Sequence, residues 1–409
     1  SLWLNALRMT IVPLVFTLVW AAGTQTVAWY AAAKGTLIIV AVLALMVVGV
    51  PFLLRGQIRS LIRLPATQRW LQWEFWPARL FYFPIGLNYI RLALKYRGIN
   101  LPTIANPGML TGGIVGESKD EILRDLYLTS PDFTARSALI VRGAPPERMT
   151  QFKRLCREHR LELPVVLKPN IAHRGSGFRL ARTLEDARDY LAQVSGEIVL
   201  QEYAAGPCEI GIFYYRFPQE ERGRIFAITE KVFPFIVGNG VSTVEQLIRA
   251  DSRAAIMAGT YLQRHHLIRD KVLESGQRLK LVEAGNHCQG CIFRDGMHLW
   301  SEQLETRIDQ ISRQMPGFFI GRYDVRYASD DDIRRGENFK ILELNGAASE
   351  ATSIYDTRNS LFQAYATLFR QWDLVFAIGA ANRKLGHRPA TLGLLRDEWK
   401  KYQQLSACY

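Results

Sequence analysis

The amino-acid sequence predicts a chain of mixed α+β architecture, with a transmembrane helical hairpin ahead of an α+β body. Two long uncharged intervals near the start predict the hairpin. Short apolar runs that alternate with helical patterns predict the body. Two further runs of alternating character, 321–327 and 340–346, predict a pair of strands around which a site is built.

Composition limits the partners of the chain. Its 409 residues suggest two or three domains, and a hydrophobic share of 48% is ample for a core. The net charge of +13 favours anionic partners such as phosphates, carboxylates and membrane surfaces. The basic residues are dispersed and carry no nucleic-acid motif, so we expect no nucleic-acid partner. Five scattered cysteines do not form the pattern of a disulfide scaffold.

The first 56 residues have the character of membrane spans. Between Arg8 and Arg55 the only charged residue is Lys34. The uncharged interval 35–54 is long enough to cross the hydrocarbon core of a bilayer. We therefore predict a transmembrane helical hairpin over 1–56 that anchors the chain in the inner or plasma membrane, with a buried helix as the alternative.

The residues after the hairpin indicate its orientation and a second region. Four arginines place the following residues in the cytoplasm by the positive-inside rule: Arg55, Arg59, Arg63 and Arg69. Residues 57–144 are predicted to form a juxtamembrane segment and an N-terminal subdomain. Aromatic residues crowd 70–83, where a segment at the membrane interface and an aromatic core are both open alternatives. Helical spacing then puts four residues on one face: Tyr89, Leu92, Ala93 and Tyr96.

The body alternates between helices and short strands. Helices are predicted over 147–160 and 184–193, the second capped by Thr183, and a capping box at Ser242 and Glu245 opens a third. Strands are predicted over four runs: 163–169, 198–203, 208–216 and 225–231. Short connections predict that the last three of these strands form one antiparallel meander.

A lysine followed by a glycine-rich loop suits a phosphate group. Lys168 ends a predicted strand, and the loop behind it carries Arg174, Gly175 and Gly177. Backbone N–H groups of such a loop approach an anion closely, and the lysine adds a point charge. An ordinary connecting loop is the alternative interpretation.

The strand pair carries the oxygen ligands of a metal site. Side chains alternate along a strand, so Arg322, Asp324 and Arg326 share one face of the first strand. By the same count, Glu343 and Asn345 share one face of the second strand. Adjacent strands would bring Asp324, Glu343 and Asn345 together, and hard oxygen ligands of this kind suit Mg²⁺. The alternative is two half-buried strands with ordinary polar faces.

The order of these features resembles the ATP-grasp enzymes, in particular their D-alanine–D-alanine ligase branch. The resemblance runs from about residue 145 to 356 and rests on this series: Lys168, a glycine loop, Gln201-Glu202-Tyr203, Glu209, Lys231, Arg322-Tyr323-Asp324 and Glu343-Leu344-Asn345. It implies an ATP-grasp fold, with two α/β subdomains clasping ATP, as a catalytic domain over 145–385 and a helical tail over 386–409. No residue clearly matches the family's first ATP-binding lysine.

The resemblance also implies the role of each site residue. It assigns the ATP phosphates to Lys168 and to the loop with Arg174, Gly175 and Gly177. It assigns the adenine to the segment Gln201-Glu202-Tyr203 and the ribose to Glu209. By a looser match, it places Asn286 at the same cleft. It assigns Mg²⁺ to Asp324, Glu343 and Asn345, and neutralisation of the transferring phosphoryl group to Lys231 and Arg322.

The implied reaction joins a carboxylate to an amine. ATP converts the carboxylate to an acyl phosphate, and the amine displaces phosphate to give an amide. The membrane hairpin adds the expectation of an amphipathic or lipid-linked substrate. An ATP-grasp kinase and a membrane-tethered nucleotide-binding module without turnover are the alternatives.

Overall fold

The computed structural model describes residues 73, 76–171, 177–204, 206–283, 285–286 and 290–406. The chain divides into two compact units, 1–75 and 76–409, and the architecture below is that of the second. Within the described part, no helix combines the length and apolar character that a membrane crossing requires. The hairpin predicted over 1–56 lies outside the described residues.

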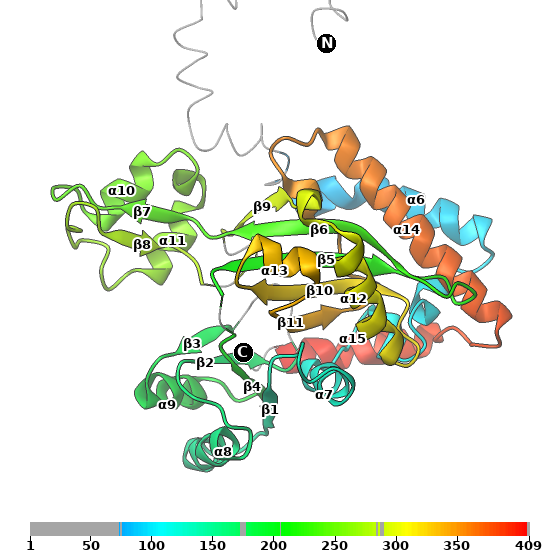
Figure 1. Ribbon diagram of the computed structural model, residues 1–409, viewed down its shortest axis with the longest axis horizontal. Coiled ribbons are helices and arrows are strands. Elements are labelled where there is room, and N and C mark those ends of the chain that lie inside the picture. Colours follow the sequence, from blue (N-terminus) through cyan, green and yellow to red (C-terminus); the bar gives the residue numbers. More distant parts are fainter. Residues whose placement is uncertain are drawn as a thin grey trace, which may run out of the picture. The chain divides into compact units, whose positions relative to one another are not determined.

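An antiparallel five-stranded sheet forms the larger layer of this unit (Figure 1). Its strand order is β11-β10-β5-β6-β9. The strands are β5 (Cys208–Tyr215), β6 (Arg224–Val232), β9 (Ile292–Asp295), β10 (Ile320–Tyr327) and β11 (Phe339–Asn345). The predicted strands at 321–327 and 340–346 are therefore confirmed as neighbours.

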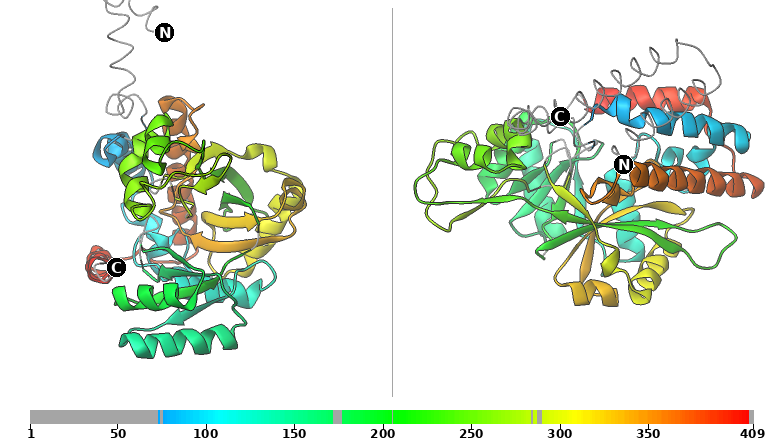
Figure 2. Two further views of the ribbon diagram at one scale, coloured as in Figure 1. Left: turned by 90° about the vertical axis from the view of Figure 1, so that its left-hand side faces the viewer. Right: turned by 90° about the horizontal axis from the view of Figure 1, so that it is seen from above.

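Helices cover both faces of the five-stranded sheet. Apolar residues of α12 (Glu302–Gln314) pack against Tyr323, Val325 and Ile341 on one face. On the other face, α14 (Leu361–Lys384) packs against the apolar end of the sheet around Phe213. Because side chains alternate, the charged residues of β10 lie on this second face, beyond the end that α14 covers. In the left view of Figure 2, α12, the sheet, α14 and α6 (Ala78–Lys95) follow one another as layers.

A separate antiparallel sheet of four strands forms the second layer. Its order is β1-β4-β2-β3, and one shared core packs it against the helices α8 and α9. The elements are β1 (Ser137–Ile140), α8 (Pro145–Glu158), β2 (Val165–Pro169), β3 (Arg179–Ala181), α9 (Leu184–Gln193) and β4 (Ile198–Glu202).

The predicted meander of three strands is wrong in its first member. β4 belongs to the smaller sheet, and only β5 and β6 pair as predicted. The physical reason lies in the link between β4 and β5. Gly206 has a φ of 127°, and a Cβ there would lie 2.3 Å from the carbonyl oxygen of Tyr327. The link passes tightly over the end of β10, and this course carries the chain from one sheet to the other.

A small insertion follows β6. The hairpin of β7 (Phe235–Val237) and β8 (Arg278–Lys280) packs with α10 (Val244–Ala250) and α11 (Ala258–Arg264) around its own apolar cluster. The predicted capping box is displaced by one residue, because Thr243 and Gln246 exchange the two capping hydrogen bonds instead of Ser242 and Glu245. Thr183 caps α9 as predicted.

The remaining elements surround the two sheets. The face of α6 with Tyr89 and Leu92 packs against Phe376 of α14, which confirms the predicted helix face. The other helices are α7 (Lys119–Thr129), α13 (Asp330–Arg335) and α15 (Leu392–Ser406). Short 3-10 helices occur at η3 (Leu101–Ile104), η4 (Leu110–Gly113), η5 (Ala254–Met257), η7 (Met297–Leu299) and η8 (Thr352–Tyr355).

Candidate active site

The candidate site lies on the face of the five-stranded sheet opposite α12. Strand register places Asp324 directly opposite Glu343 on one side and Gly211 on the other. The same register pairs Arg322 with Asn345. Residues that are direct partners across a ladder point to the same face, so the predicted meeting of Asp324, Glu343 and Asn345 is confirmed.

Five charged side chains form a largely buried network on this face. Lys231 Nζ lies 2.9 Å from Glu209 Oε1 and 3.1 Å from Asp324 Oδ1. Arg322 Nε donates to Asp324 Oδ1 at 3.1 Å. Arg326 Nη2 donates to Glu209 Oε2 at 2.9 Å. Three cations against two carboxylates leave the network with an excess of one positive charge.

The network holds Asp324 and Lys231 in their charged forms. Burial opposes ionisation of Asp324, but Arg322 and Lys231 outweigh burial and hold the pKa of Asp324 below its ordinary value. Burial lowers the pKa of Lys231, but Asp324 and Glu209 outweigh burial and raise that pKa above its ordinary value. A fixed positive charge therefore lies beside the carboxylates, where a phosphate group would be stabilised.

Two residues that the sequence analysis missed complete the other side of the site. Lys119 Nζ lies 3.6 Å from Glu343 Oε1. Glu117 Oε1 accepts a hydrogen bond from the Gly346 N–H at 2.9 Å, and burial raises the pKa of Glu117 to about 7. Lys119 is the first residue of α7, and Glu117 stands two positions before it. In the sequence, 229 positions separate Glu117 from Gly346. No motif or periodicity in the sequence links them to β11.

Lys168 reaches the five-stranded sheet from the smaller one. The register of β10 and β11 shifts after Asp324, which leaves Leu342 without a partner residue on β10. Lys168 Nζ donates to the carbonyl oxygen of Leu342 at 2.9 Å and to Gln201 Oε1 at 3.0 Å. Gln201 Nε2 donates to the same carbonyl at 3.0 Å. Burial lowers the pKa of Lys168 to about 8.

The two predicted loops differ in how far they are described. Arg174 and Gly175 lie outside the described residues, whereas Gly177 is a turn residue with a φ of 70°. In the second loop, a Cβ on Gly285 would lie 2.1 Å from Glu209 Oε1 and 2.7 Å from Lys231 Cδ. The backbone beside Asn286 therefore lies directly against the charged network, and a nucleotide contact of Asn286 stays a prediction.

The predicted adenine-reading segment lies at the link between the sheets. Gln201 is buried and bonded within the protein, and Glu202 Oε2 accepts a hydrogen bond from Arg136 Nε at 2.6 Å. The ring of Tyr203 lies 4.8 Å from the guanidinium of Arg326, which connects this segment to the charged network. The nucleotide contacts of these residues stay a prediction.

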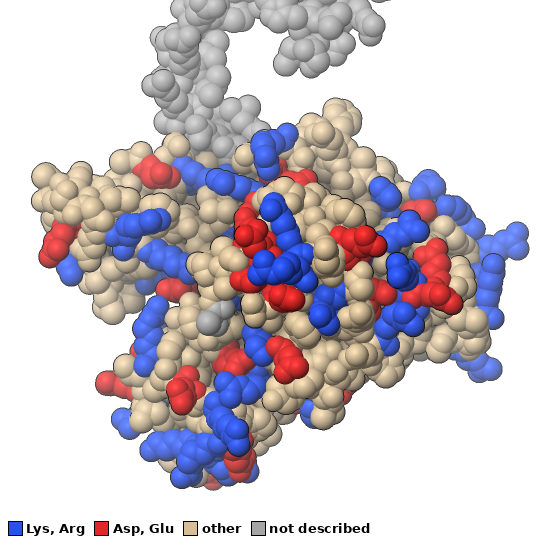
Figure 3. Space-filling model, in the orientation of Figure 1, with Lys and Arg blue, Asp and Glu red and all other residues tan. Residues whose placement is uncertain are grey.

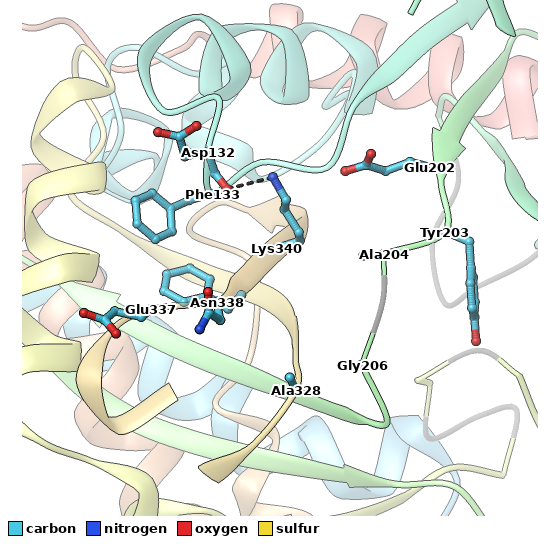
Figure 4. Close-up of a pocket in the computed structure, with 11 residues that line it drawn as sticks. Asp132, Phe133, Glu202, Tyr203, Ala204, Gly206, Ala328, Glu337, Asn338 and Lys340 are labelled. Atoms are coloured by element: carbon cyan, nitrogen blue, oxygen red, sulfur yellow. Dashed lines mark hydrogen bonds between the residues drawn. The ribbon is translucent and has the colours of Figure 1, made fainter. Parts of the chain in front are cut away.

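A cavity of about 740 Å³ lies at the same link (Figure 4). Its lining includes Glu202, the backbone around Gly206 and Phe339 at the start of β11. Lys340 crosses it and donates to the carbonyl oxygen of Asp132 at 2.7 Å. None of the residues of the charged network is among the described residues that line this cavity.

The donor set of Asp324, Glu343 and Asn345 fits Mg²⁺ chemically. Two carboxylates and an amide provide hard oxygen ligands. Asn345 Nδ2 is buried and has no hydrogen-bond partner among the described residues, so a rotation of the amide places its oxygen there at no cost in hydrogen bonds. No group of three or more His, Cys, Asp or Glu in the described ranges is arranged to hold a metal. Mg²⁺ sites with one or two carboxylates complete their coordination with substrate phosphates and water.

Comparison with known proteins gives matches among solved structures only. No protein-family model matches the chain, and no curated protein sequence matches it significantly. A bifunctional glutathione synthetase from Pasteurella multocida has 14% identity and a TM-score of 0.32, over 64% of this chain and 38% of that chain. The D-cycloserine synthetase DcsG has 11% identity and a TM-score of 0.35, over 62% of this chain and 70% of that chain.

A third match is the VanG D-Ala:D-Ser ligase from Enterococcus faecalis. It has 14% identity and a TM-score of 0.33, over 64% of each chain. This chain therefore spans less than half of the Pasteurella synthetase and less than two thirds of the Enterococcus ligase.

Proposed function

We propose that the chain is an ATP- and Mg²⁺-dependent carboxylate–amine ligase that forms an amide bond through an acyl phosphate. The observation that carries this proposal is the pairing of Asp324 with Glu343 beside buried cations on one sheet face. Lys168 approaches this face from the other sheet. Such a site holds a polyphosphate chain and stabilises the charge that moves during phosphoryl transfer.

Each part of the site has a role in the proposed reaction. Lys168 binds a phosphate oxygen, and Lys231 and Arg322 neutralise charge on the transferring group. Asp324, Glu343 and Asn345 would hold Mg²⁺, which supplies charge neutralisation of the phosphates. The attacking amine needs alignment with the acyl phosphate more than it needs a nucleophile from the protein.

The remaining contacts extend the proposal to the whole nucleotide. The loop with Arg174, Gly175 and Gly177 covers the phosphates, and Glu209 binds the ribose. The segment Gln201-Glu202-Tyr203 reads the adenine, with Asn286 at the border of the site. We further propose that residues 1–56 hold this domain on the cytoplasmic face of the inner or plasma membrane, where an amphipathic or lipid-linked substrate reaches it.

A turnover experiment with isotope-labelled carboxylates tests the proposed reaction. The full-length chain, in detergent and in vesicles, is given ATP, Mg²⁺ and pairs from a panel of ¹⁸O-carboxylates and amines. A ligase releases ADP together with phosphate that carries ¹⁸O from the carboxylate, and mass spectrometry finds the amide. Phosphorylated product without free phosphate would indicate a kinase. ATP binding without ADP release across the panel would indicate a binding module, and either outcome would refute the proposed ligase.

A further inference from the structure

The helix α6 has two apolar faces. One face packs inward, with Phe81, Ile85 and Leu92 buried. The other carries a stripe of exposed apolar residues at spacings of three and four, which keeps them on one side of a helix. This outer stripe consists of Leu80, Phe83, Leu87, Ile90 and Leu94. These five residues are between 49% and 75% exposed, so no described residue covers this apolar face of the helix.

The position of α6 leaves the outer stripe available to a partner. α6 packs on α14 through its inner face, where Leu92 contacts Phe376. The left view of Figure 2 places α6 on the outside of this layer. A continuous exposed apolar stripe of this kind marks an interaction surface more often than a free protein surface.

The charges along α6 indicate the kind of partner. The helix carries Arg79, Arg91 and Lys95 and no Asp or Glu. Arg79 and Arg91 are exposed and stand beside the outer stripe, whereas Lys95 lies toward α14 and pairs with Asp373 at 2.8 Å. The face seen in Figure 3 differs, because Lys and Arg lie there among Asp and Glu. An apolar stripe flanked by exposed arginines is the pattern of a helix that lies in the interface of an anionic lipid bilayer.

The sequence ahead of α6 favours the same partner. Residues 1–72 lie outside the described residues and contain the uncharged interval 35–54. The tryptophans Trp70, Trp73 and Trp76 stand directly before α6, and tryptophan is enriched at the headgroup level of membranes. We propose that α6 docks on the surface of an anionic bilayer through its outer stripe, with Arg79 and Arg91 at the headgroups.

Lipid photolabelling of the full-length chain tests this proposal. The protein is reconstituted in vesicles of phosphatidylcholine and phosphatidylglycerol that contain a phospholipid with an acyl-chain diazirine. After irradiation, mass spectrometry maps the lipid adducts on tryptic peptides. We expect adducts on the outer stripe and none at Val241 and Leu267, which are more exposed apolar residues on the insertion after β6.

A double variant provides the matched control. Leu87→Gln with Ile90→Gln should lower the adduct yield on α6 by at least about tenfold, since two apolar side chains lose their transfer free energy. Val241→Gln with Leu267→Gln should leave that yield unchanged. Circular dichroism should be unaltered in both, because all four side chains are exposed.

Three outcomes would overturn the proposal. Equal labelling of α6 and of the insertion would mean that lipid reaches the protein without docking. An unlabelled α6 that a lysine-reactive crosslinker joins through Lys95 to a second copy would make the stripe a dimer contact. An unlabelled α6 crosslinked to residues 1–72 of the same chain would mean that the chain covers its own stripe.

Discussion

Replacement of Glu343 by glutamine should lower turnover strongly but change the free energy of unfolding little. Its one described ion pair, with Lys119, is 3.6 Å long, and the Glu343 side chain is 27% exposed. Loss of such a pair costs less than about 1 kcal/mol of unfolding free energy. The same carboxylate is the direct register partner of Asp324 and a proposed Mg²⁺ ligand. A metal ion supplies several kcal/mol of charge stabilisation, so we expect turnover to fall by at least roughly a hundredfold.

The assay compares ADP release and urea unfolding for Glu343→Gln and a control. Glu245→Gln is a close match, because Glu245 has a side-chain exposure of 28% and one ion pair, on α10 of the insertion. The control should keep both turnover and stability. Glu343→Gln should keep stability and require more Mg²⁺ for the turnover that remains. Wild-type turnover and Mg²⁺ dependence in a folded Glu343→Gln protein would refute the assignment.

Four further changes test other parts of the structure. Asp324→Asn leaves the buried Lys231 and the half-buried Arg322 without their shared carboxylate, so urea unfolding should show a loss of about 3–5 kcal/mol. An unchanged free energy of unfolding would contradict the role of the charged network in stability. Arg148→Met removes a buried donor to the carbonyls of Leu191, Val194 and Gly196, at and after the end of α9, and should lower the free energy of unfolding by roughly 3–5 kcal/mol. A change under about 1 kcal/mol would show that water replaces the guanidinium. Gly206→Ala should cost about 1–3 kcal/mol because its Cβ meets a backbone oxygen, and a neutral result would mean that the link relaxes. ATP affinity, by calorimetry, should fall as the pH rises through about 8, where Lys168 loses its proton, and Lys168→Met should abolish this dependence.

The same lysine affects stability with the opposite sign. Its pKa in the folded protein is lowered, so above pH 8 the unfolded chain binds more protons than the folded one. The contribution of Lys168 to the free energy of unfolding therefore rises with pH between about 8 and the ordinary lysine pKa. Affinity and stability that moved together over this range would contradict the assignment.

Local pattern was enough to predict the elements and the centre of the site. Alternation along 321–327 and 340–346 puts Asp324, Glu343 and Asn345 on one face, and register confirms it. The same alternation places Arg326 on the face of Asp324, and in the structure it donates to Glu209 in the charged network. These features depend on residues two positions apart in one strand, and such residues share a face because side chains alternate along a strand.

Features that depend on contacts distant in sequence escaped prediction. The assignment of β4 to the smaller sheet depends on the course of the link at Gly206, which no periodicity records. Lys119 and Glu117 enter the site from before α7 through contacts with β11. A charged pair beside a helix start is common on protein surfaces, so their types alone did not distinguish them from solvated residues.

The register shift at Leu342 has a consequence for the direction in which Lys168 can bind. A charged ammonium has three N–H bonds in a tetrahedral arrangement, and the carbonyl of Leu342 and Oε1 of Gln201 accept two of them. The direction of the third is thereby fixed by the protein before any phosphate arrives. A neutral amine has only two N–H bonds, so deprotonation would turn a lone pair toward the same point. One proton on Lys168 therefore decides whether this fixed direction carries an N–H donor, which attracts an anion, or a lone pair, which repels it.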